Sequence, residues 1–65
     1  MKDDNIGRLI VFNGIFIGVI IGKKEELYPP HYYKIYWFNT KPGCSNWNIE
    51  RFNNLLKEGW IKFLG

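Results

Sequence analysis

Cysteine and histidine are scarce in this chain of 65 residues, and alanine and glutamine are missing altogether. The single cysteine, Cys44, excludes an internal disulfide. Together with His31, the one histidine, it cannot supply the four ligands of a structural zinc site. We therefore expect no metal and no cofactor, and stability has to come from the burial of apolar side chains.

Large aromatic side chains are abundant instead, with 3 Trp, 4 Tyr and 5 Phe. A chain this short buries only about 60 % of the surface of its unfolded form, so the core depends on a few large rings that bury roughly 150–250 Å² each. The length predicts one domain over residues 1–65, with residues 1–5 as a loose lead-in.

The net charge is +3, but the basic residues are scattered and form no run typical of a nucleic-acid-binding tail. Lys23 and Lys24 are followed at once by Glu25 and Glu26. A lone reduced cysteine fits the cytoplasm, and the polar start of the chain is unlike a signal peptide. We expect a cytoplasmic protein.

Asn13-Gly14 separates two apolar runs and predicts a β-hairpin with a type I′ turn, because both residues tolerate positive φ. We expect strands over 8–12 and 15–21, with a bulge or sharp bend at Gly18. Gly14, Gly18 and Gly22 are four residues apart, which would form a packing face in a membrane helix. The apolar stretch is shorter than the about 20 residues of a span, so we expect no membrane contact.

The segment 23–31 contains Pro29-Pro30 and predicts an exposed loop. A strand over 32–38 follows, because nearly all of its residues favour β-structure. A period of two places Tyr33, Ile35 and Trp37 on one face. The other face, predicted to point outward, holds Lys34 and the aromatic residues Tyr32, Tyr36 and Phe38.

The last third of the chain predicts a turn-rich connection over 39–46 that contains Lys41-Pro42-Gly43, a short strand near Trp47, a helix and a closing strand over 60–64. Asn48 is a suitable helix N-cap, apolar residues recur at helical spacing over 49–56, and Gly59 is placed to end the helix. Together these elements predict a mostly-β fold, a small SH3-like barrel of about five strands with one short helix before the last strand.

Several segments carry a resemblance, namely Gly7-Arg8-Leu9-Ile10-Val11, Gly18-Val19-Ile20-Ile21 and Tyr33-Lys34-Ile35-Tyr36-Trp37-Phe38. In this order they resemble the SH3-like barrels of the KOW and Tudor type, over about residues 6–64. More narrowly, with the Trp, the short helix and the terminal Gly-Trp-Ile-Lys that follow, they resemble short barrel proteins of tailed bacteriophages. The resemblance implies a phage accessory protein in the host cytoplasm. Nucleic-acid-binding KOW domains have a basic loop where this chain has Glu25-Glu26.

Few groups are suited to catalysis. His31 as general base and Cys44 as nucleophile form the one available pair, and nothing in the sequence orients them or adds a third group. Adjacent carboxylates such as Asp3-Asp4 point to opposite sides of an extended chain, and the glycines form no phosphate-binding motif. We expect that the protein is not an enzyme.

The best candidate site is the outward face of strand 32–38, because aromatic residues are favoured anchors of protein interfaces. The first hypothesis is a binding module that docks on a larger protein, a host protein if a phage encodes the chain. Its predicted contact residues are Tyr28, His31, Tyr32, Lys34, Tyr36 and Phe38. In the opposing interpretation, the helix or the last strand covers this face and its rings belong to the core.

Two other functions stay open. A nucleic-acid-binding barrel would stack bases on these rings and contact phosphates with lysines, namely Lys23, Lys24, Lys34 and Lys41. The third possibility is a component of a virion or of its assembly.

Overall fold

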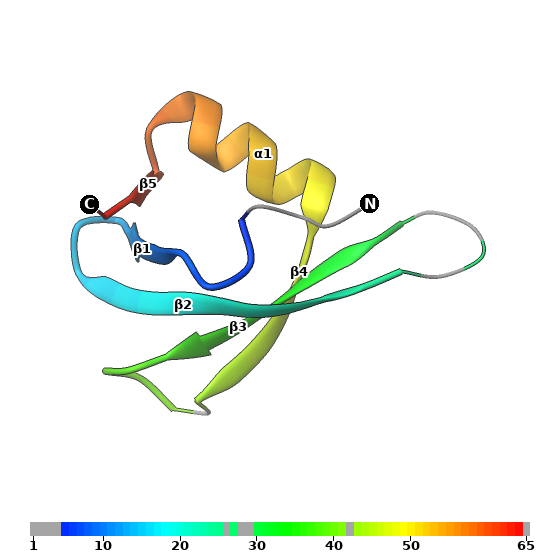
Figure 1. The fold of residues 1–65 in the computed structure, drawn as a ribbon. Helices are drawn as coiled ribbons and strands as arrows, with labels where there is room; N and C mark the ends of the chain where they lie inside the picture. Colours follow the sequence, from blue (N-terminus) through cyan, green and yellow to red (C-terminus); the bar gives the residue numbers. More distant parts are fainter. Residues whose placement is uncertain (1–4, 26, 28–29, 42, 65) are drawn as a thin grey trace.

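Five strands and one helix make up the fold. The computed structural model describes residues 5–25, 27, 30–41 and 43–64. The elements are β1 (Leu9–Phe12), β2 (Phe16–Lys24), β3 (Tyr32–Trp37), β4 (Cys44–Asn48), α1 (Ile49–Glu58) and β5 (Ile61–Phe63). All strand pairs are antiparallel, in the order β4-β3-β2-β1-β5 (Figure 1). The predicted mostly-β fold, with a short helix before the last strand, is confirmed.

The sheet is open but curled. The edge strands β4 and β5 are joined through α1, which contacts both of them. Phe12 of β1 and Trp47 of β4 are three strands apart in the sheet order, yet their ring centroids are only 5.2 Å apart. A flat sheet would separate these strands by roughly 14 Å. The curl therefore encloses the core on the side of the sheet that α1 covers.

The β1–β2 hairpin turns at Asn13-Gly14 as predicted. Asn13 has φ 56° and Gly14 has φ 71°. The Ile15 N–H donates to the carbonyl of Phe12 at 3.1 Å. Positive φ at both central residues defines the type I′ turn, whose twist matches that of the flanking strands.

Of the bulge or sharp bend predicted at Gly18, the bulge lies elsewhere. Gly18 pairs regularly with Ile10 and Trp37, and the register between β2 and β3 shifts between Ile20 and Gly22. A Cβ on Gly18 would lie 2.8 Å from Cε3 of Trp37 and 2.8 Å from the carbonyl oxygen of Tyr36. The glycine is required because β3 and the indole approach this point closely.

The loop predicted over 23–31 begins later in the structure. Lys23 and Lys24 belong to β2 and pair with Tyr33 and Tyr32. Because the bulge adds one residue to β2, it changes which side of the sheet each following residue faces. Lys23 consequently lies on the same side as the buried Tyr33, and Lys24 on the opposite side.

Gly18→Ala should destabilise the fold by about 1–3 kcal/mol, since its methyl group meets a backbone oxygen and a buried ring. Gly22→Ala in the same strand is the matched control, because a methyl group there would have no atom within 4 Å. The control should lie within about 1 kcal/mol of the wild type. Urea unfolding of both variants measures the difference, and equal midpoints would contradict the close approach at Gly18.

Helix α1 begins and ends at the predicted residues. The Asn48 side chain accepts hydrogen bonds from the backbone N–H groups of Glu50 (2.9 Å) and Arg51 (3.3 Å). Gly59 has φ 90°, and the N–H groups of Gly59 and Trp60 donate to the carbonyls of Leu56 and Leu55. These two bonds form a Schellman motif that stops the helix and turns the chain into β5.

The core lies between the curled sheet and α1. Along β3 the predicted alternation is confirmed, with Tyr33, Ile35 and Trp37 buried and Lys34 and Tyr36 exposed. Phe52 is the one fully buried residue of α1 and packs edge-on against Tyr33, with ring centroids 5.1 Å apart. The other buried apolar side chains among the described residues are Ile10, Ile20 and Ile61. No helix in the described part of the chain has the length and hydropathy of a membrane span.

Candidate functional site

The side of the sheet that faces away from the core carries two cross-strand rows of side chains. Residues directly opposite each other in an antiparallel sheet share one face. The pairing registers, with the bond from the Leu64 N–H to the Leu9 carbonyl, give a row of Leu64, Leu9, Val19, Tyr36 and Cys44. The neighbouring row consists of Lys62, Val11, Ile17 and Phe38. We call the apolar members of these rows the outer patch: Leu9, Val11, Ile17, Val19, Tyr36, Phe38 and Leu64.

The outer patch is open to solvent. Tyr36 is 41 % exposed and Phe38 is 55 % exposed, and their rings meet edge to face with centroids 5.3 Å apart. Leu9, Ile17 and Leu64 are also exposed. The interpretation that places Tyr36 and Phe38 in the core is therefore wrong. Helix α1 lies against the other face of β3, and β5 lies at the far edge of the sheet.

Strand β2 is apolar on both of its faces over residues 16–21. Gly18 and Ile20 face the core, while Ile17 and Val19 face outward. A strand with this pattern is typical of a sheet covered on both sides, and in the described structure only one side is covered. The contributions of β1 and β2 to the outer patch were missed from the sequence. The available signal was the uninterrupted apolar run of β2, which lacks the alternation expected of a half-exposed strand.

Positive charge borders the outer patch. Lys34 precedes Tyr36 by two residues on the same face of β3, and Lys62 lies opposite Val11 at the edge of the second row. Lys34 forms no ion pair with any described residue. The acidic residues that the structure describes, Glu25, Glu50 and Glu58, all lie outside the strands of the sheet. The patch is thus an apolar centre with a basic margin.

The other three predicted contact residues differ in where they lie. Tyr32 is half-buried and lies on the outward face, opposite Lys24 and Asn48. His31 lies apart, near the start of α1, where its carbonyl accepts from the Ile49 N–H at 2.9 Å. Its Nδ1 is buried and has no hydrogen-bond partner within the described residues. Tyr28 lies outside the described residues.

Three of the four lysines assigned to nucleic-acid binding gather around one shallow hollow. Lys23, Lys24 and Lys34 line it together with Gly22 and Asn46. Lys41 lies away from them, in the connection between β3 and β4. The structure therefore does not bring all four predicted lysines together.

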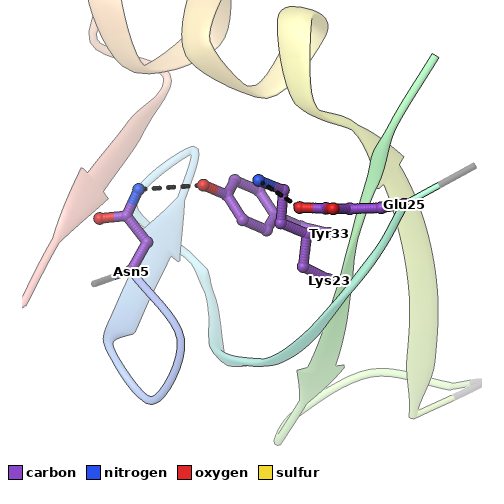
Figure 2. Close-up of polar contacts among 4 residues, drawn as sticks. All are labelled: Asn5, Lys23, Glu25 and Tyr33. Carbon is purple, nitrogen blue, oxygen red and sulfur yellow. Dashed lines mark hydrogen bonds and ion pairs between the residues drawn. The ribbon is translucent and has the colours of Figure 1, made fainter. Parts of the chain in front are cut away.

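Lys23 forms an ion pair with an acidic neighbour. Its Nζ lies 3.0 Å from Oε1 of Glu25, and this hydrogen bond and charge lower the pKa of the Glu25 carboxyl. Figure 2 shows this ion pair beside the ring of Tyr33, whose hydroxyl accepts a hydrogen bond from Nδ2 of Asn5 at 3.1 Å. Asn5, the last residue of the predicted lead-in, is thus tied to the sheet, and residues 1–4 lie outside the described residues.

The structure separates His31 from Cys44. Cys44 pairs with Tyr36 at one end of β4, and Asn48 at the other end pairs with Tyr32, which follows His31. Four residues of extended strand span roughly 13 Å, well beyond the distance of a hydrogen bond. No group of three or more His, Cys, Asp or Glu side chains suited to a metal ion occurs among the residues that the structure describes.

Comparisons with protein families, with curated protein sequences and with solved structures find no match to this chain.

Proposed function

We propose that this protein is a non-enzymatic binding module that docks on a larger protein through the outer patch. The observation that carries the proposal is the apolar outward face of β2, which joins Tyr36 and Phe38 into one surface across the sheet. Burial of apolar surface contributes roughly 25 cal/mol per Å². A partner that covers the patch therefore gains from aromatic and branched aliphatic side chains that are already held in place by the sheet.

The chemistry of the patch also indicates which kind of partner surface complements it. Lys34 and Lys62 border the apolar centre, so the complementary surface is apolar with carboxylates at its margin. A second copy of this chain fits less well, because two copies face to face would bring these basic margins together. The resemblance to short barrel proteins of tailed phages points to a host protein as the partner, bound in the host cytoplasm.

Cys44 provides a direct test, because it is exposed and lies opposite Tyr36 at the end of the first row. A photoactivatable cross-linker attached to this single cysteine should capture one main protein from a bacterial host lysate. The matched control is Cys44→Ser combined with Glu58→Cys, which moves the same cross-linker to the exposed end of α1.

Capture from Cys44 should be lost with Phe38→Ser and retained with Leu27→Ser, which removes an apolar side chain that is 88 % exposed outside the patch. Equal capture from both cross-linker positions, or insensitivity to Phe38→Ser, would contradict the proposed docking face.

Nucleic-acid binding is the second candidate, favoured by the hollow that Lys23, Lys24 and Lys34 line together. If these three lysines each contact one phosphate of a single strand, affinity should fall roughly 15- to 20-fold between 50 and 200 mM salt. Lys34→Gln should then make the slope of log affinity against log salt concentration shallower by the contribution of one phosphate contact. A gel-shift titration with single-stranded DNA and RNA measures both effects. A flat salt response, or no shift at low salt, would exclude this candidate.

A further inference from the structure

A second surface feature lies at the β1–β2 turn end of the curled sheet, on its inner side. A hollow of about 250 Å³ opens there between β1, β2, β3 and β4. Its walls are the rings of Phe12, Phe16, Trp37 and Trp47, and polar groups come from Thr40, Lys41 and Ser45. None of these residues belongs to the outer patch, so the hollow is independent of the proposed docking face.

The rings stand at different angles around this space. Phe12 and Phe16 are stacked, with an interplanar angle of 24°, whereas Trp47 stands edge-on to Phe12 at 80°. Phe12, Phe16 and Trp47 are only half-buried, so part of each of these side chains remains open to a ligand. The arrangement suits one ring or one branched aliphatic group.

Ser45 fixes the two indoles. Its Oγ accepts hydrogen bonds from Nε1–H of Trp37 at 2.8 Å and from Nε1–H of Trp47 at 3.0 Å. A serine hydroxyl has two acceptor lone pairs and one hydrogen to donate. Both lone pairs are used here, and the hydroxyl hydrogen has no acceptor among the described residues.

The polar groups beside the aromatic walls can all donate a hydrogen bond. The Ser45 and Thr40 hydroxyls each have a hydrogen to offer, and the exposed ammonium of Lys41 forms no ion pair in the described part of the chain. A suitable ligand has an apolar body and a negatively charged acceptor. A positively charged ligand would gain from the ring faces but would be repelled by Lys41.

We propose that this hollow binds a small aromatic or branched aliphatic carboxylate, with the apolar body between the rings and the carboxylate toward Lys41 and Ser45. This chemistry occurs in free arylalkanoic acids and in the last residue of a polypeptide that ends in a residue such as Phe. The volume is below the 300–1,000 Å³ of most ligand sites, which limits the bound group to about one side chain.

The three tryptophans make the test direct, because Trp37 and Trp47 line the hollow and Trp60 does not. In ¹H–¹⁵N NMR spectra, titration with 3-phenylpropionate should shift the indole N–H signals of Trp37 and Trp47 and leave that of Trp60 in place. Its uncharged analogue, 3-phenylpropanamide, should bind more weakly. Lys41→Gln should lower the affinity for the carboxylate about two- to fivefold without changing that for the amide, and Lys62→Gln should change neither.

A peptide ending in Phe with a free carboxylate, compared with the same peptide amidated, identifies the source of the ligand. Tighter binding of the free-carboxylate peptide than of 3-phenylpropionate indicates a polypeptide end, and equal binding indicates a free acid. The proposal is overturned if the amide binds as well as the carboxylate, if phenyltrimethylammonium binds more tightly than either, or if Trp60 shifts together with Trp37 and Trp47.

Discussion

Phe52→Ala is expected to lower the free energy of unfolding more than any other single replacement considered for this protein. Phe52 is the fully buried residue of α1 and contacts the sheet through the rings of Tyr33 and Phe63, whose centroids lie 5.1 and 6.3 Å away. Replacement of a buried Phe by Ala costs about 3–5 kcal/mol. A domain of this length has roughly 3–10 kcal/mol of stability in total, so the loss is at least about a third of the free energy of unfolding.

Asn53→Ala is the matched control, because the next residue of the same helix is exposed. Alanine favours the helix slightly over asparagine, so this variant should unfold at the wild-type urea concentration or slightly above it. Far-UV circular dichroism during urea unfolding measures both variants. A Phe52→Ala protein with wild-type stability would show that α1 does not close the core.

The double replacement Tyr36→Ser with Phe38→Ser is expected to retain the fold and to lose binding of the partner. Both rings are more than two-fifths exposed, and their mutual contact is worth about 0.5–1.5 kcal/mol. Aromatic anchors at the centre of an interface contribute about 2 kcal/mol or more each. Affinity for the partner should therefore fall at least about 100-fold, while the free energy of unfolding falls by about 1–2 kcal/mol.

Ile35→Ser is the control for this pair, because Ile35 is the neighbour of Tyr36 in β3 but is fully buried. It should unfold the protein and lose binding together with structure. If Tyr36→Ser with Phe38→Ser unfolds the protein to the same extent, these rings support the fold and the docking proposal fails.

The elements whose local signals are short-range could be predicted from the sequence. Asn13-Gly14 specifies its turn through positive φ at both residues, and Asn48 and Gly59 specify the ends of α1 through capping. The alternation over β3 separates Ile35 from Tyr36 because the period of a strand is two. The same period places Tyr36 and Phe38 on one face with Lys34, but whether that face is open or covered is decided by where α1 and β5 lie.

Features that depend on contacts between distant residues could not be predicted. Gly18 is needed because Trp37 and the backbone of Tyr36 approach it from another strand, and a glycine in a strand does not distinguish this from a bulge. The bulge between Ile20 and Gly22 changes the faces of Lys23 and Lys24. His31 adjoins the aromatic strand in sequence, but its backbone carbonyl bonds to the start of α1.

The most direct test of the central claim is the rate at which a neutral maleimide modifies Cys44 in the free protein and in the complex with the partner that cross-linking identifies. In the free protein the exposed thiol should react fast, and the partner should slow the reaction many-fold, because Cys44 continues the row that contains Tyr36. A cysteine at position 58, introduced by Glu58→Cys with Cys44→Ser, should react equally fast in both states. Unchanged reactivity of Cys44 in a saturated complex would show that the partner binds elsewhere and would contradict docking through the outer patch.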